Sequence, residues 1–296
     1  MKISHSETNT IQQVLSKLII NPRCLIRCLG SPKTFLNEID ISNNCREILY
    51  DFFEKESHQI LASALFLARK RFLAIIESLY IYKKIKSMDE LDILWNKYLS
   101  SFKYDDRAPK NPIYEVINFC NYIKVNENNS KLENLILEYE IAKHQVILNY
   151  NLWPNSYGVA RDHINKNEII NIEEQYLFIH PCAKIIEFSG NITEVVHAIT
   201  KSALTTDLIF KEKNEKLIFY KNFNNGMFTT ISANKTILLL MDVIKQNITI
   251  KNMHEACEKE NIFTDFNAFV DTIKKLVQIG IFIVICKQKK DEYFVL

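Results

Sequence analysis

The chain has 296 residues, of which 47% are hydrophobic and 24% are charged, and its formal net charge is +2. This composition is typical of a globular protein with two or three modest domains, and the balanced charge argues against nucleic acid or an anionic membrane as ligand. Only five glycines occur, all far apart, which excludes the glycine-rich phosphate loops of P-loop and Rossmann proteins. No apolar run is long enough to span a bilayer, and the polar N-terminus lacks a signal-peptide core, so a cytoplasmic location is expected.

The first half of the chain is predicted to be helical, because apolar residues recur there at helical spacing. Proline, serine N-caps and polar breaks separate the expected helices. These helices cover residues 10–20, 25–29, 44–55, 58–84, 88–102, 112–125 and 131–149. Residues 1–150 are therefore expected to form an all-helical bundle, followed by a connecting segment over residues 151–204.

A basic patch interrupts the apolar stripe of the helix predicted over residues 58–84. Arg69, Lys70 and Arg71 form this patch, which is either a solvated face or a contact for a partner protein.

Two polar side chains lie one helical turn apart on the helix predicted over residues 131–149. Glu140 and His144 have a spacing that suits metal coordination, but the sequence places no third ligand near them. A surface or interface pair is therefore the expectation. Another histidine, His180, stands beside a proline in an extended segment and is expected to be a hydrogen-bonded turn residue.

The last third of the chain, residues 205–296, is predicted to be a small winged-helix-like domain. Strand-like runs come first, at 207–212, 216–222 and 226–232. Helix-like runs follow at 234–245, 249–260 and 265–279, and an apolar strand is expected at 280–286. The expected fold class is α+β, with a helical bundle followed by a three-stranded antiparallel sheet and three helices.

The start of the chain reads IQQVLSKLIINPRCLIRCLGSPKTFLNEIDISNNCREIL. It resembles the opening of bacterial partner proteins of multinuclear non-haem iron oxidases that modify ribosomally made peptides, methanobactin precursors being one example. Later segments are similar to other parts of that family: SALFLARKRF, NPIYEVINFCNYI, LENLILEYEIA and YLFIHPCAKIIEFSGNITEVVHAI.

This first resemblance implies a non-catalytic subunit that forms a heterodimer with an iron oxidase. The iron is expected in the oxidase, and this chain is expected to hold no cofactor, metal ligand or catalytic residue. The partner surface is expected on the helical bundle, with Arg69, Lys70, Arg71, Glu140 and His144 as candidates.

The order of segments in the last third resembles the peptide-recognition module of ribosomal-peptide pathways, of which the pyrroloquinoline-quinone chaperone is the free-standing example. That resemblance implies that a precursor's leader peptide adds as a strand beside residues 226–232, in a groove against the helix at 265–279. A strand edge offers main-chain hydrogen bonds with little demand on sequence. The expected contacts are Gly226, Met227, Phe228, Thr229, Thr230 and Ile231 on the strand, and Phe266, Phe269, Val270, Ile273 and Lys274 on the helix.

One point about this edge stays open at the level of sequence. The apolar helix residues are as well suited to the core as to a peptide groove. Proline at Thr229 is expected to remove an edge N–H and to weaken leader binding.

Two other functions are compatible with the same segments. A winged-helix transcriptional regulator would use the helix at 265–279 to read DNA, but that helix sets Asp265 and Asp271 against Lys274 and Lys275 and lacks arginine. A stand-alone metalloenzyme would have to use scattered histidines. The favoured hypothesis is a subunit that holds a precursor peptide for a partner enzyme.

Overall fold

A computed structural model of the chain describes residues 4–104, 111–152, 172–180, 182–201, 210–222, 225–245 and 248–285. The chain divides into two compact units, Met1–Glu133 and Asn134–Leu296. This division falls near the start of a helix, whereas the sequence placed the domain boundary at the end of that helix, at residue 150. Within the segment predicted to connect the domains, residues 151–204, the stretches 153–171 and 202–204 and residue 181 lie outside the described residues.

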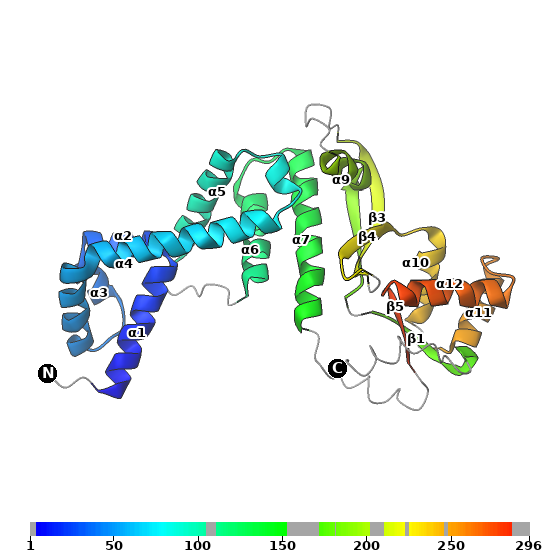
Figure 1. Ribbon diagram of the computed structural model, residues 1–296, viewed down its shortest axis with the longest axis horizontal. Helices are drawn as coiled ribbons and strands as arrows, with labels where there is room; N and C mark the ends of the chain where they lie inside the picture. The colour runs from blue at the N-terminus through cyan, green and yellow to red at the C-terminus, as the bar shows by residue number, and fades with distance from the viewer. Residues whose placement is uncertain are drawn as a thin grey trace. The chain divides into compact units, whose positions relative to one another are not determined.

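The first unit is built from helices (Figure 1). They are α1 (His5–Ile20), α2 (Pro22–Gly30), α3 (Pro32–Glu38), α4 (Asn43–Ser78), the 3-10 turn η1 (Tyr82–Lys84), α5 (Met88–Ser101) and α6 (Pro112–Asn126). Polar side chains fix where several of them begin. Ser4 with Glu7 and Ser87 with Glu90 form capping boxes, in which each serine accepts an N–H bond and each glutamate bonds back to the cap.

The longest helix, α4, joins two segments that the sequence predicted as separate helices. Glu56 has non-helical dihedral angles (φ −117°, ψ 15°), so α4 is kinked where the break was expected. Ser42 caps the start of α4 by accepting the N–H of Cys45, as expected. The helix ends at Ser78 rather than at residue 84, because the chain turns at Leu79 and tightens into η1.

Apolar side chains of the first unit form a core among α1, α2, α3 and the first half of α4, with Leu18, Leu25, Leu49 and Phe53 at its centre. An aromatic cluster links α4, α5 and α6. The Trp95 ring lies 6.0 Å from that of Phe72, 5.3 Å from that of Tyr98 and 5.6 Å from that of Phe119. This cluster fixes the position of α5 against α4 and α6.

The second unit combines helices with two small antiparallel sheets (Figure 1). Its elements are α7 (Lys131–Leu152, which begins in the first unit), the turn η3 (Ile172–Glu174), β1 (Tyr176–Ile179), β2 (Lys184–Gly190), α9 (Ile192–Thr200), β3 (Glu212–Lys221), β4 (Phe228–Ser232), α10 (Lys235–Ile244), α11 (Ile250–Lys259), α12 (Phe266–Gln278) and β5 (Phe282–Ile285). One sheet has the order β2-β3-β4, and the other pairs β1 with β5. The predicted α+β fold class, with a three-stranded antiparallel sheet, is confirmed.

The identity of one strand in that sheet differs from the prediction. The first strand of the sheet is β2, which lies in the segment expected to connect the domains, whereas the sequence predicted a strand over residues 207–212. Glu212 instead begins β3, while residues 207–209 lie outside the described residues. The strand predicted at 280–286 corresponds to β5 and pairs with β1, outside the three-stranded sheet.

Helices cover both faces of the three-stranded sheet, and this places α7 in the second unit. Four consecutive residues of β3 are buried, which requires cover on both sides. On one face Tyr139 of α7 packs against Phe219 and Phe188, with ring centroids 5.2 Å and 6.5 Å apart. On the other face Ile218 and Tyr220 join a core shared with α10, α11 and α12.

The three C-terminal helices begin as the sequence predicts, because each has a polar N-cap. Asn234, Thr249 and Asp265 each accept a backbone N–H from the first turn of the helix that follows. Thr249 also forms an isolated bridge to Tyr176 of β1. Within the described residues, no helix has both the length and the apolar character needed to cross a bilayer.

Candidate functional site

Strand β4 is an outer strand of the three-stranded sheet. It pairs with β3 on one side, and no other strand in the described part of the chain pairs with its opposite side. The predicted docking segment, residues 226–232, therefore contains a sheet edge. An edge of this kind offers backbone donors and acceptors to an added strand.

Two backbone hydrogen bonds between β3 and β4, one at each end of the pair, fix which backbone groups of β4 point outward. The N–H of Asn222 donates to the carbonyl of the opposite residue Met227 at 2.8 Å, and the N–H of Ala233 donates to the carbonyl of the opposite residue Lys216 at 2.8 Å. Hydrogen-bonded pairs alternate along an antiparallel ladder. Thr229 and Ile231 therefore direct their backbone groups toward β3, and the residues between and after them point away from it.

The outward-pointing set includes Thr230 and Ser232. No backbone hydrogen bond of either residue to another described residue points away from β3. The expectation that proline at Thr229 would remove an edge N–H is therefore wrong, because that N–H faces Tyr220 inside the ladder.

Side chains along β4 are anchored to the layers on either side of the sheet. The Thr230 hydroxyl forms a hydrogen bond with Tyr139 of α7, and Ile231 packs on the core of the C-terminal helices. The Phe228 ring lies under the Lys221 ammonium, 5.6 Å from centroid to nitrogen. The backbone of the edge is thus held in place from both faces.

The first two residues of the predicted strand contact belong to the turn that precedes β4. Gly226 has a positive φ of 69°, a conformation that favours glycine, and its N–H donates to the carbonyl of Asn222 at 2.7 Å. Met227 follows with its side chain 66% exposed.

The candidate peptide contacts on α12 divide into two groups. Phe269, Val270 and Ile273 are buried in the core that α10, α11, α12 and the sheet share. These three side chains are therefore core residues, which is the alternative to a peptide groove that the sequence left open. Phe266 is half-buried and packs edge-on against His254, and Lys274 is exposed.

The three basic residues of α4 have different environments. The Arg71 guanidinium is largely buried and forms a two-pronged ion pair with the buried Glu115, while its Nη1 donates to the carbonyl of Ile20 at 2.6 Å. Arg71 therefore joins α1, α4 and α6 inside the first unit and is not available to a partner. Arg69 and Lys70 are exposed, the former paired with Asp92 at 2.8 Å.

The predicted pair on α7 is brought together but is buried. The Glu140 side chain is fully buried, and the His144 Nδ1 lies 2.8 Å from the Glu140 carbonyl oxygen. Burial lowers the pKa of His144 to about 4, so its ring is neutral near pH 7 despite lying 3.9 Å from the Glu140 carboxylate. The two side chains are placed for structure and not for contact with a partner.

His180 is a turn residue, as the sequence indicates. Its ring Nδ1 accepts the N–H of Cys182 at 3.0 Å, and its carbonyl accepts the N–H of Ala183 at 2.7 Å. Burial lowers the pKa of His180 to about 4. Among the described residues, no group of three or more His, Cys, Asp or Glu side chains is arranged to hold a metal ion.

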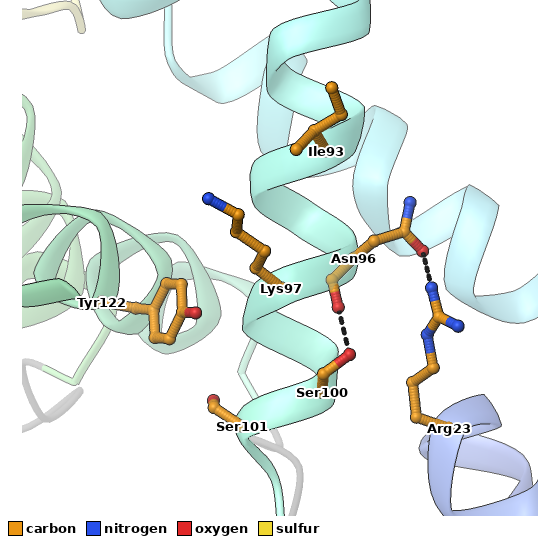
Figure 2. Close-up of a pocket in the computed structure, with 7 residues that line it drawn as sticks. All are labelled: Arg23, Ile93, Asn96, Lys97, Ser100, Ser101 and Tyr122. Carbon is orange, nitrogen blue, oxygen red and sulfur yellow. Dashed lines mark hydrogen bonds between the residues drawn. The ribbon is translucent and has the colours of Figure 1, made fainter. Parts of the chain in front are cut away.

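Sequence reasoning missed a hollowed surface on the first unit. An open depression of about 560 Å³ lies along α5 and is shown in Figure 2, with Arg23 of α2 on one side and Tyr122 of α6 on the other. Ile93, Lys97 and Ser100 of α5 line it between these two.

A second, deeper hollow of about 250 Å³ adjoins the first and shares Arg23 and Asn96 with it. Its floor is formed by the buried Ala68, Trp95 and Leu99. Leu65 of α4 lines its wall and is 49% exposed. The signal that could have shown this surface is the number of apolar residues in 61–79, which exceeds what one face of a helix can bury.

Comparison with known proteins adds no family. No protein-family model matches the chain, and no curated protein matches it.

Proposed function

We propose that the chain is a non-catalytic subunit that binds a ribosomally made precursor peptide through its leader and presents it to a multinuclear iron oxidase. The observation that carries the proposal is the outward edge of β4 on a sheet backed by helices on both faces. The proposal also rests on the resemblance of the sequence to oxidase partner proteins.

An extended peptide is the ligand that this edge suits best. Thr230 and Ser232 each turn an N–H and a carbonyl away from β3, which is the pattern that an added antiparallel or parallel strand needs. Main-chain pairing supplies affinity, and side chains of the peptide that alternate between the two faces supply specificity.

The contacts around β4 hold the strand in its binding conformation, so that little conformational entropy is lost when a peptide binds. The hydrogen bond between the Thr230 and Tyr139 side chains and the packing of Ile231 hold β4 before any ligand arrives. A preformed edge loses little conformational entropy when a peptide adds to it. The exposed side chains nearest the start of the strand, such as Met227, are available for contact with the peptide.

Under this proposal the metals that perform the oxidation reside in the partner, and this chain contributes binding and orientation. Holding a substrate at a fixed position relative to a reactive centre accelerates a reaction without any catalytic group in the holder. The oxidase is proposed to form a heterodimer with this chain, in the cytoplasm.

Co-expression tests the proposal. The full chain, affinity-tagged, is produced together with the proteins and short peptides encoded around it, and the purified material is examined for iron and by mass spectrometry. We expect an iron protein and a short peptide to co-purify, and a synthetic copy of that peptide to bind in a fluorescence-polarisation titration. Binding to operator DNA that weakens steeply with salt, with neither peptide nor iron protein retained, would instead identify a transcriptional regulator.

A further inference from the structure

The hollowed surface of the first unit has the features of a protein-docking site. Three helices contribute one stripe each to the deeper hollow: Pro22 and Ile26 from α2, Leu65 and Ala68 from α4, and Trp95 and Leu99 from α5. These helices contact one another directly, so the hollow has a fixed floor. Apolar side chains continue beyond the hollow, with Phe66 62% and Ile93 57% exposed.

A chain of hydrogen bonds crosses the rim of this hollow. Arg69 Nη1 donates to Asp92 Oδ1 at 2.8 Å, and Asn96 Nδ2 donates to Asp92 Oδ2 at 3.2 Å. Arg23 Nη2 then donates to Asn96 Oδ1 at 3.2 Å, as Figure 2 shows. The amide of Asn96 is oriented by this chain, because Arg23 can only donate and the Asp92 carboxylate can only accept.

The rim carries one positive charge in excess. Its four residues hold two guanidinium groups, on Arg23 and Arg69, for the single carboxylate of Asp92. No carboxylate in the described residues lies within ion-pair distance of Arg23, which donates instead to the neutral amide of Asn96. In the adjoining depression Lys97 is already neutralised by Glu127 at 2.8 Å. An incoming carboxylate would give Arg23 a charge-assisted bond, which is stronger than its bond to an amide.

We infer that this α2–α4–α5 surface docks the partner oxidase, through a segment that inserts an aliphatic side chain into the hollow and pairs a carboxylate with Arg23. This inference rests on the proposed function, and it assigns the oxidase to the first unit and the peptide to the β4 edge of the second. The arrangement has the composition of an interface centre, with an apolar pocket, an aromatic floor at Trp95 and an arginine at the rim.

A protein suits this surface better than a small ligand. The hollow is partly open to solvent, and the apolar surface around it extends over three helices to the exposed Ile26, Phe66 and Ile93. An exposed apolar patch of this kind, bordered by charged residues, is typical of a protein-binding surface. The Lys70 ammonium lies 4.7 Å from the Phe66 ring centroid and adds a further cation to Arg23 and Arg69 at this border.

The test measures two affinities on the same variants of the full chain. Co-expression with the multinuclear iron oxidase that the proposed function requires gives the complex, and biolayer interferometry gives its Kd. Arg23→Glu and Leu65→Ser are expected to weaken oxidase binding by about tenfold or more. Lys55→Glu and Val125→Ser change exposed residues that line neither hollow, and they are expected to leave the Kd unchanged. Leader binding, measured by fluorescence polarisation, is expected to be the same in all four variants.

A second readout isolates the charge. Oxidase binding by the wild type is expected to weaken as NaCl rises from 50 to 500 mM (roughly the range over which exposed charges become screened), and Arg23→Gln is expected to flatten that dependence.

Three outcomes would overturn the inference. Oxidase binding that Arg23→Glu and Leu65→Ser leave intact would place the oxidase elsewhere, while the proposed function would stand. A wild-type chain that binds the leader but no oxidase would remove the oxidase from the proposed function and this docking surface with it. Self-association of the wild type in sedimentation velocity, abolished by Arg23→Glu, would show that a second copy of the chain occupies the surface.

Discussion

Asn222 and Met227 set the hydrogen-bonding phase of the edge strand β4. The N–H of Asn222 donates to the carbonyl of Met227 directly opposite, at 2.8 Å. Because such pairs recur at every second residue of an antiparallel ladder, this one bond determines which residues of β4 present their backbone to a ligand. Single substitutions can therefore separate the ladder from the edge.

Proline at Ser232 tests the edge directly. Ser232 points its N–H away from β3, and its side chain is exposed, so Ser232→Pro removes an outward donor without removing a ladder bond. We expect leader affinity to fall by about fivefold to tenfold, the effect of one lost hydrogen bond of about 1 kcal/mol, while the midpoint of urea unfolding stays close to that of the wild type. Fluorescence polarisation and circular dichroism measure the two quantities.

Two further variants serve as controls for Ser232→Pro. Ser232→Ala keeps the N–H and is expected to bind the leader normally. Thr229→Pro removes a donor that faces Tyr220, so it is expected to lower the stability of the second unit. Equal leader affinity in Ser232→Pro and Ser232→Ala would show that the peptide does not pair with this edge.

Most of the helices could be predicted from the sequence, because each of them begins at a polar N-cap residue that lies next to it in the chain. Ser42, Asn234 and Asp265 cap α4, α10 and α12 where the sequence placed those starts. The same reasoning missed α3, a short helix with Pro32 in its first turn and no side-chain hydrogen bond at its cap.

The pairing of strands was less predictable, because it depends on residues distant in the sequence. In the sequence, α9 separates β2 from its partner β3, and most of the second unit separates β1 from its partner β5. The burial of side chains on α4 and α7 was hard to predict for the same reason, because it too depends on residues distant in the sequence. Nothing within the triplet 69–71 distinguishes Arg71, which is buried by Glu115 of α6, from its exposed neighbours.

Phe269 is expected to be a core residue whose loss destabilises the second unit. Its side chain is fully buried, with the rings of Phe263 and His254 5.3 Å away. Phe269→Ala is expected to reduce the free energy of unfolding by about 3–5 kcal/mol, as large-to-small changes in cores do. Urea denaturation followed by circular dichroism measures the change. The half-buried Phe266 is the matched site, and a loss in Phe266→Ala as large as that in Phe269→Ala would contradict this assignment.

Arg71 and Glu115 are expected to be strongly coupled in stability. Their side chains are only 16% and 6% exposed, so Arg71→Met leaves a buried carboxylate without its partner. A loss of about 3–5 kcal/mol is expected from this change. The double variant Arg71→Met/Glu115→Leu removes both charges and is expected to recover much of that loss.

The exposed pair on the same helix provides the comparison. Arg69 and Asp92 are about half exposed, and Arg69→Met is expected to cost no more than about 1 kcal/mol. Chemical denaturation of the wild type, Arg71→Met, Glu115→Leu and the double variant gives the coupling energy between Arg71 and Glu115, and Arg69→Met is measured beside them. Additive effects of Arg71→Met and Glu115→Leu would show that the two side chains do not stabilise each other.

His180 is expected to make the second unit less stable as the pH falls. Burial lowers the pKa of His180 to about 4, whereas an unfolded histidine titrates near 6.5. Between these two values the unfolded state binds more protons than the folded state, so this contribution is complete above about pH 6.5 and declines as the pH falls toward 4. At pH 5 the loss from one such histidine is about 2 kcal/mol relative to pH 7.

His180→Asn tests this prediction, because the Oδ1 of asparagine can accept the Cys182 N–H in place of the ring Nδ1. Urea unfolding of the wild type and the variant is followed between pH 7 and pH 4.5. The wild type is expected to lose stability more steeply than His180→Asn, and the remaining slope is expected to include His144, whose pKa burial also lowers to about 4. Parallel curves for the two proteins would mean that protonation of His180 does not oppose folding.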